Sequence, residues 1–226
     1  MPGKSKSYAR RRTIVAPAGA TKAQRIFLDL RSKILCGSIR PESRLTLRPL
    51  ASEYGTGINA VSEAVKALAS EGLVTLEGHA GARVIPRDLN RIRGEFILRI
   101  AIECETVRRC TETIDEVQMA VLEGMAVKVD RLFEEGDQLT ECRLADVQFH
   151  LTIADFSGVG QLKDALIPLL DRLVMLDQTE TRTAEIPGQK HLEVFECLKS
   201  RDPVAAAQIM RRHLEHSMNL SLALLY

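Results

Sequence analysis

Three features are missing from this sequence, and each absence narrows the class of protein. No apolar run approaches the ~20 residues that cross a bilayer, so the sequence predicts no membrane span. The basic residues near the N-terminus are followed by no apolar segment, which argues against a secretory signal. The cysteines show no CxxC spacing, so we expect reduced, half-buried thiols on helices of a cytoplasmic protein. They are Cys36, Cys104, Cys110, Cys142 and Cys197.

Charge is distributed unevenly along the chain, although the net charge is only +1. Residues 1–86 contain 14 Lys and Arg against 6 Asp and Glu, whereas the remainder contains 17 against 24. This asymmetry suggests that the first part faces a polyanion such as nucleic acid. A basic arm and an acidic helical surface unrelated to nucleic acid would give the same balance, so charge alone leaves both open. At 226 residues the chain is long enough for two domains.

The first part of the chain predicts a winged helix-turn-helix over residues 21–86, preceded by a flexible basic arm at 1–20. Thr21 is placed as an N-cap, and Gly55-Thr56-Gly57 separates two short helices. The expected elements in order are a helix from Thr21 to Gly37, an extended piece at 44–46, helices at 47–54 and 59–71, and a two-stranded hairpin at 73–76 and 82–85.

In such an arrangement the helix after the turn enters the major groove of DNA and the wing lies along the backbone. His79 and Arg83 of the hairpin would then lie near phosphates. Any two short helices joined by glycine give a similar pattern without DNA binding, although the wing in the correct order favours DNA. The expected DNA-contacting residues are Arg44, Arg48, Thr56, Gly57, Asn59, Ala60, Ser62, Lys66, His79, Gly81 and Arg83.

Beyond Pro86 the apolar period stays helical to the end of the chain, which predicts a mainly α fold with an antiparallel all-helical bundle as a second domain over 87–226. The apolar residues of the last helix and the first helix of this bundle could form either dimer contacts or core. The expected helices are 89–111, 114–135, 139–157, 160–180, 187–199 and 203–224.

A metal site is suggested by Asp146 and His150, which are four residues apart on a helical segment and therefore share a face. His191 and His213 occur on later helices. A carboxylate with three imidazoles suits a divalent ion such as Zn, Ni, Mn or Fe. Taken alone, an Asp-x-x-x-His pair is more often a surface ion pair or a satisfied core histidine.

The first part of the chain resembles GntR-type regulators. The resemblance lies in the helix and G-x-x-x-P turn from Ile26 to Pro41 and in the segments 45–51, 61–65, 71–74 and 81–84, and it covers roughly 22–86. It departs from the family pattern S-R-x-x-V-R-E-A-L at two positions. Ile58 and Ser62 stand where the family has arginines, and each lost bidentate contact could cost on the order of 1–3 kcal/mol. Arg48 matches the arginine of the family's preceding helix. The basic arm, Lys66 and Arg44 could compensate, or the operator could differ.

The second part resembles the FCD effector domain of FadR-like regulators, with the six-helix length of the VanR-like subgroup. The resemblance lies in Asp-x-x-Phe-His at 146–150, in His191 and in Arg-Arg-His-Leu at 211–214. It implies that Asp146, His150, His191 and His213 are the metal ligands.

The resemblance also extends to the pocket of that domain. It implies that Arg99 pairs with an effector carboxylate, although a salt bridge from Arg99 to Glu103 is the alternative. His216 and His79 match no ligand and are expected at the surface. The segment Ser157-Gly158-Val159 departs from the family's Ser-Gly-Asn. This departure removes a polar pocket contact or cap, so the resemblance does not identify the effector.

Together these features predict a homodimeric repressor of transcription that binds a double-stranded operator and responds to a small organic acid held at a divalent metal ion. A metal-dependent hydrolase-like enzyme is the rival class, because a metal with an open position can activate water. The sequence shows no separate general base beside the ligands, so we expect no enzyme. A third class, motivated by Ile58 and Ser62, is a regulator with weakened DNA binding that acts through protein contacts.

Overall fold

The computed structural model describes residues 19–35, 37–78, 81–86, 88–136, 139–176 and 190–223. Residues 1–18 of the expected basic arm, Cys36 and His79 lie outside this range. The chain forms two compact units, one of residues 1–87 with 174–178 and the other of residues 88–173 with 179–226. None of the described helices is long and apolar enough to span a membrane.

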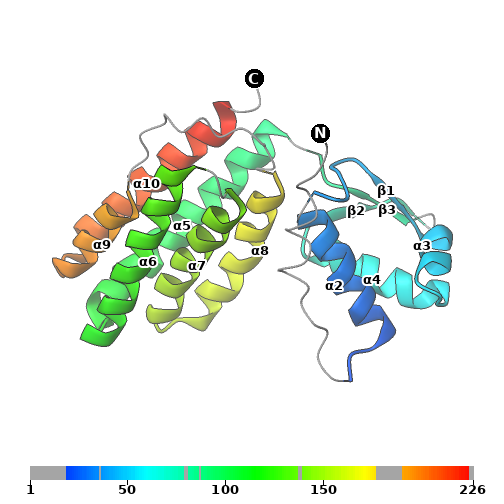
Figure 1. The fold of residues 1–226 in the computed structure, drawn as a ribbon, viewed down its shortest axis with the longest axis horizontal. Coiled ribbons are helices and arrows are strands. Elements are labelled where there is room, and N and C mark those ends of the chain that lie inside the picture. The colour runs from blue at the N-terminus through cyan, green and yellow to red at the C-terminus, as the bar shows by residue number, and fades with distance from the viewer. Residues whose placement is uncertain are drawn as a thin grey trace. The chain divides into compact units, whose positions relative to one another are not determined.

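The first unit has the expected order of elements (Figure 1). They are α2 (Lys22–Leu35), β1 (Arg44–Thr46), α3 (Leu47–Glu53), α4 (Ile58–Ser70), β2 (Val74–Leu76) and β3 (Gly81–Val84). Thr21 caps α2 as predicted, because its Oγ1 accepts the backbone N–H of Gln24 at 3.1 Å and Gln24 Oε1 accepts the N–H of Thr21 at 2.8 Å. The winged helix-turn-helix prediction is therefore confirmed.

The core of this unit lies between α2 and α4. The buried residues of both helices recur at intervals of three and four, so each helix turns one apolar stripe inward. In α2 they include Ile26, Leu30 and Ile34, and in α4 they are Val61, Ala64, Val65 and Leu68. The outward face of α4 is thereby left to solvent.

The sheet has three strands in the order β1-β3-β2, and both pairings are antiparallel. The sequence predicted a two-stranded wing with a separate extended piece at 44–46. That piece instead pairs with the free edge of β3, with Leu45 opposite Ala82. Gly81 makes this approach possible, because its φ is 140° and a Cβ there would lie 2.0 Å from the Leu45 carbonyl oxygen.

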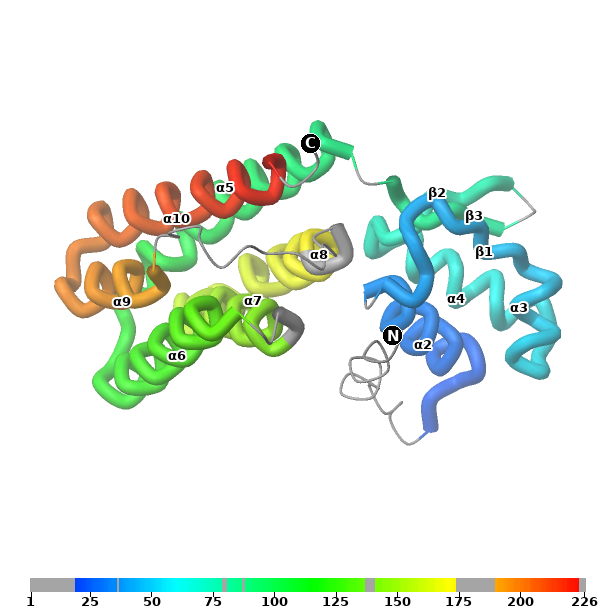
Figure 2. The backbone as a smooth tube through the Cα atoms, turned by 45° about the horizontal axis from the view of Figure 1, so that its top comes forward, coloured from blue at the N-terminus to red at the C-terminus, as the bar shows by residue number. Residues whose placement is uncertain are grey.

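The second unit consists, in its described part, of six helices, and Figure 2 shows α5 and α10 lying side by side. The helices are α5 (Leu89–Thr113), α6 (Glu116–Glu135), α7 (Leu139–Phe156), α8 (Gly160–Leu176), α9 (His191–Lys199) and α10 (Pro203–Ala223). Their number and order agree with the prediction. The helix α6 begins two residues later than expected, because Asp115 caps it and forms a capping box with Gln118.

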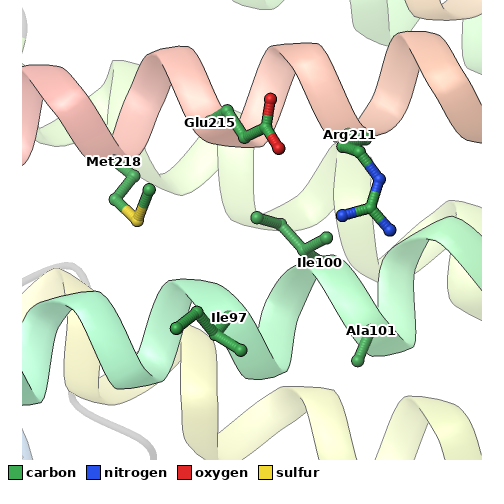
Figure 3. Close-up of a pocket in the computed structure, with 6 residues that line it drawn as sticks. All are labelled: Ile97, Ile100, Ala101, Arg211, Glu215 and Met218. Atoms are coloured by element: carbon green, nitrogen blue, oxygen red, sulfur yellow. The ribbon is translucent and has the colours of Figure 1, made fainter.

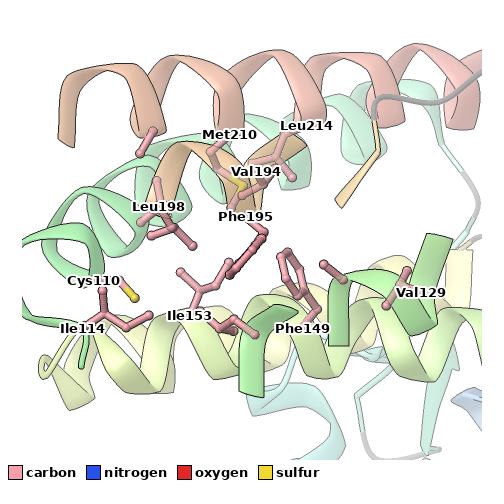
Figure 4. Close-up of a cluster of buried hydrophobic side chains, with 14 of the residues drawn as sticks. Cys110, Ile114, Val129, Phe149, Ile153, Val194, Phe195, Leu198, Met210 and Leu214 are labelled. Atoms are coloured by element: carbon pink, nitrogen blue, oxygen red, sulfur yellow. The ribbon is translucent and has the colours of Figure 1, made fainter. Parts of the chain in front are cut away.

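The core of the second unit is an apolar cluster drawn from α5, α6, α7, α9 and α10, together with Ile114 just after α5 (Figure 4). Phe149, Ile153 and Phe195 are each at most 1% exposed at its centre. Burying a side chain of this size stabilises the fold by roughly 1.5–3 kcal/mol. The cluster fixes the helices that carry the polar residues described next.

Two smaller expectations are wrong in part. Cys104 and Cys197 are half-buried free thiols as expected, but Cys110 and Cys142 are fully buried. Burial raises the pKa of Cys110 to about 12, so it behaves as an apolar core residue. His216 is half-buried rather than a surface residue, and its Nε2 is a buried atom without a hydrogen-bond partner in the described part of the chain.

Candidate metal centre and nucleic-acid interface

Asp146, His150, His191 and His213 converge inside the second unit. Each offers one ligand atom, and these atoms all lie within 4.8 Å of one another. The three imidazoles are buried, whereas the side chain of Asp146 is 25% exposed. The helix α7 supplies the first two residues from adjacent turns, and the other two come from the start of α9 and the middle of α10.

The contacts within this cluster fit a divalent cation. His191 Nε2 lies 2.9 Å from Asp146 Oδ1, and His150 Nε2 lies 3.8 Å from the same oxygen. The ring centroids of His191 and His213 are 4.6 Å apart. His150 Nε2 is buried and makes no hydrogen bond to any described residue. A buried nitrogen left without a partner beside a carboxylate is the kind of donor that a metal ion would satisfy.

Asp130 of α6 orients one of these imidazoles. Its Oδ1 lies 2.9 Å from His191 Nδ1 and accepts the backbone N–H of His191 at 2.9 Å. Its Oδ2 accepts the N–H of Leu192 at 3.1 Å. Because Asp130 occupies Nδ1, the Nε2 atom of His191 is directed at the cluster, which is how outer carboxylates support metal-bound histidines.

Glu103 of α5 has the matching position beside His150. Its Oε2 lies 2.5 Å from His150 Nδ1, and its Oε1 accepts a hydrogen bond from Arg99 Nε at 2.5 Å. Glu103 is 1% exposed and Arg99 5% exposed, so this is a buried pair. From the sequence, Glu103 was identified only as a partner of Arg99, and Asp130 was not identified. Asp130 could have been found as a carboxylate on the inward stripe of α6, which also contains Leu122 and Ala126.

The electrostatics of the centre follow from burial and from this pairing. Burial opposes ionisation of Asp146 and Glu103, yet neighbouring positive groups lower both pKa values, that of Glu103 to about 2. Burial disfavours a charged His191, but its hydrogen bonds to Asp130 and Asp146 raise its pKa to about 9. Burial and the nearby imidazoles lower the pKa of His213 well below 6.5. The centre thus combines ionised carboxylates with a neutral His213.

Arg99 forms the predicted alternative ion pair with Glu103, but only through Nε. Its Nη2 is buried and has no hydrogen-bond partner among the residues that the structure describes. The positive charge of Arg99 also acts on Asp146 and on His213. Arg99 is therefore close enough to the cluster to affect a molecule bound there.

A separate groove of about 310 Å³ lies between α5 and α10. Figure 3 shows Ile97, Ile100 and Ala101 of α5 on one side and Arg211, Glu215 and Met218 of α10 on the other. None of the four clustered residues lines this groove. It is therefore a different feature from the metal centre.

The predicted DNA-contacting residues of α3 and α4 are mostly on the surface. Arg48 of α3 and Asn59 and Lys66 of α4 are exposed, as is Gly57 at the N-cap of α4. Thr56, Ala60 and Ser62 are half-buried. Ile58, the first residue of α4, is 44% exposed despite being apolar.

Two further residues of this surface are held by one carboxylate. Glu77 Oε2 accepts a hydrogen bond from Arg44 Nε at 2.9 Å, and its Oε1 accepts one from Arg83 Nε at 2.7 Å. These arginines lower the pKa of Glu77. Gly81 is buried in the sheet against β1. The close approach of the two backbones explains why a glycine occupies this position, a role that the sequence did not indicate.

A winged helix-turn-helix joined to an all-helical unit defines the class of two-domain DNA-binding transcription regulators. Two family models match the chain: "Bacterial regulatory proteins, gntR family" at residues 22–84 and "FCD domain" at residues 96–216. The second covers more than half of the chain. The protein belongs to the GntR family of transcription regulators and carries the FCD domain of its FadR-like branch.

Individual relatives agree with this assignment. The transcriptional repressor RspR of Escherichia coli K12 is 29% identical over 195 residues, which is 85% of each chain. The gluconate operon transcriptional repressor of Bacillus subtilis is 28% identical over 70% of this chain and 65% of its own. A putative GntR regulator from Rhodococcus sp. RHA1 has the same fold, with a TM-score of 0.72 and 22% identity over 90% of this chain and 99% of that one.

Proposed function

We propose that this protein is a repressor whose affinity for its operator is controlled by a small organic acid bound at a divalent metal ion. The observation that carries the proposal is the cluster of Asp146, His150, His191 and His213, whose ligand atoms lie within 4.8 Å of one another. The family consists of transcription regulators and not of enzymes. A metal in this centre therefore serves binding rather than turnover.

The surroundings of the cluster support a ligand role more than a purely structural one. Asp130 and Glu103 each contact the Nδ1 atom of one histidine, so the Nε2 atoms of His191 and His150 are directed at the shared centre. If these ion pairs served packing alone, they would not explain why the buried His150 Nε2 has no hydrogen-bond partner in the described part of the chain. The donor set favours Zn, Ni, Mn or Fe over the hard ions Mg and Ca.

A carboxylate is the effector chemistry that fits this pocket. The metal would supply positive charge and open positions for carboxylate oxygens. Arg99 Nη2 is a buried cationic donor without a protein acceptor in the described chain, and it acts on the same cluster. An organic acid that spans the metal and Arg99 would satisfy both.

Repression is supported by the names of two relatives. RspR and the gluconate operon protein are both described as transcriptional repressors. A repressor that binds an operator loses or gains affinity when the effector shifts the balance between its conformations. For this chain we expect the effector to weaken operator binding.

A homodimer is the form that we propose for DNA binding, with the α5/α10 groove at the contact between copies. Ile97, which lines the groove, and its neighbour Leu98 are 56% and 51% exposed, so both present apolar surface to solvent. Arg211 and Glu215 line the same groove with opposite charges, and a twofold axis would pair each with the other. Sedimentation of Ile97→Glu should give monomers, whereas Val204→Glu, at an exposed site near the start of α10, should stay dimeric. Dimers in both would contradict this contact.

The metal proposal is tested by elemental analysis of the purified protein and of His213→Ala. We expect one divalent ion per chain in the wild type and little in the variant, together with a lower Tm, because the ion binds the folded state only. His216→Ala is the matched control, since His216 is on the same helix but outside the cluster. If the wild type holds no stoichiometric metal after reloading with Zn, Ni or Mn, the histidines are structural.

The DNA proposal is tested by fluorescence anisotropy with duplexes from the region upstream of the protein's own gene. Specific binding should weaken as salt rises, because Lys and Arg contacts release counterions from phosphates. His213→Ala should keep basal binding and lose the response to candidate organic acids. Absence of any specific complex at low salt would favour a regulator that acts through protein contacts.

A further inference from the structure

We infer that Ile58 reads the C5-methyl group of a thymine in each half of the operator. This inference rests on the proposed binding of a homodimer to DNA, and it identifies a base that each copy would recognise. Ile58 is the first residue of α4, the helix that follows the turn. In a helix-turn-helix, the N-terminal residues of that helix are those that meet base edges in the major groove.

The exposure of Ile58 supports a contact outside its own chain. Its side chain is 44% exposed, whereas Val61, Val65 and Leu68 of the same helix are at most 2% exposed. A branched apolar side chain on the outer face contributes little to the core of the unit. It gains apolar contact only when another molecule covers it.

The neighbours of Ile58 allow a base pair to approach closely. Gly57 precedes it, with no atom within 4 Å of the place where a Cβ would be. Ser62 lies one turn further along α4 on the same side and is short and half-buried. The first turn of α4 contains no acidic residue that would repel phosphates. Small neighbours compensate for the limited reach of an isoleucine.

The chemistry of Ile58 selects among bases. A side chain without donors or acceptors cannot recognise guanine O6 and N7, but it can pack against the methyl group of thymine. Only thymine carries such a group in unmodified DNA. Exposed Asn59 is the next residue, and its amide can pair with adenine in the same region of the groove. An A·T-containing step is therefore the expected target.

The test uses the full-length protein and uracil, which is thymine without the methyl group. Duplexes retained from a random pool are sequenced, and each conserved thymine is then replaced singly by deoxyuridine. We expect one position per half-site at which this replacement weakens binding roughly fourfold, the effect of about one buried methyl group. In Ile58→Ala this sensitivity should disappear, and in Ile58→Val it should be intermediate. Val204→Ala, an exposed valine of the other unit, should retain it.

The possible outcomes separate this inference from the proposed function. Retained duplexes that show no uracil effect, or the same effect in Ile58→Ala, would overturn the thymine contact while leaving DNA binding intact. Failure to retain any duplex at low salt would overturn both. A selected guanine opposite residue 58 in Ile58→Arg, in place of the wild-type thymine, would further support the assignment.

Discussion

Glu77 connects two arginines that the sequence assigns to DNA, so in the proposed complex this single carboxylate would compete with phosphate for both. Arg44 Nε and Arg83 Nε donate to its two oxygens at 2.9 and 2.7 Å. The side chain of Arg44 is 67% exposed, so water and salt screen the pair and its effect on folding is small. We expect a larger effect on the binding of a polyanion.

Glu77→Gln should therefore tighten binding to nonspecific duplex DNA at low salt. The change removes a negative charge and frees both guanidinium groups, so we expect roughly threefold or greater tightening and a steeper dependence on salt. Anisotropy at several salt concentrations measures both quantities. Glu193→Gln, an exposed glutamate of α9 in the other unit, makes the same change in charge and should leave them unaltered. Equal tightening in the two variants would show that the effect comes from net charge and not from release of Arg44 and Arg83.

Asp130→Asn should weaken binding of the proposed metal without altering any of the four proposed ligands. Asp130 contacts His191 through the ring Nδ1 and the backbone N–H, and it also accepts the N–H of Leu192. Asp130→Asn should lower metal affinity by roughly 10–100-fold. Competition with a chromophoric chelator measures this directly.

The same substitution at Asp155, an exposed residue of α7 that pairs with Lys163, provides the control. Asp155→Asn should leave metal affinity unchanged. If Asp130→Asn also leaves it unchanged, the hydrogen bond to His191 serves packing alone.

Individual residues differ in how far the sequence could predict their position. The four clustered residues were predictable, because Asp146 and His150 follow helical spacing and the family resemblance supplied the two others. Asp130 and Glu103 were not identified as partners of these histidines, since each lies on a helix distant in sequence and only tertiary packing shows the contact. The half-buried position of His216 has the same origin: its helix packs along α5, whose inner face the sequence does not define.

The secondary-structure elements were predictable where a long apolar period exists. All six helices of the second unit and the three of the first were expected, because buried residues recur every three or four positions. The strand β1 was only partly predicted, since three residues carry too short an alternation to specify a partner. Its pairing with β3 depends on Gly81, which brings the two backbones together.

Gly81→Ala tests that dependence at the level of the wing. An added Cβ would lie 2.0 Å from the Leu45 carbonyl oxygen at a φ of 140°, so β1 and β3 must separate. We expect DNA affinity to fall at least tenfold while metal content stays at the wild-type level, because the cluster is in the other unit. Backbone strain of this kind costs roughly 1–3 kcal/mol before the clash is included.

Gly78→Ala is the matched control in the same hairpin. Gly78 also has a positive φ, of 58°, but nothing lies within 4 Å of an added Cβ. Its expected cost is only about 1 kcal/mol and its expected loss of DNA affinity is small. Equal losses in both variants would show that hairpin flexibility, and not the approach of β1 to β3, supports the wing.

At the scale of the whole molecule, the predicted DNA contacts and the proposed metal ligands belong to different units, which predicts two distinguishable unfolding events. The clustered residues all lie beyond Arg87, and the helix-turn-helix core lies before it. A ligand that binds only the folded form stabilises the unit that contains its site, by about 2.7 kcal/mol at a hundredfold excess over Kd. Saturating Zn should therefore raise the temperature of one unfolding transition by several degrees and leave the other unchanged. Differential scanning calorimetry of the full chain, with and without Zn, measures both transitions.

Leu68→Ala identifies which transition belongs to which unit. Leu68 is 0% exposed in the core between α2 and α4, so its truncation should destabilise the first unit by roughly 2–5 kcal/mol. The transition that this variant lowers should be the one that Zn does not move. If Zn raises that same transition, or raises both equally, the two units unfold as one, and the effector signal would be transmitted through shared stability. If Zn and Leu68→Ala shift different transitions, the two units unfold independently. The proposed effector response would then require a change in the arrangement of these units rather than in a shared stability.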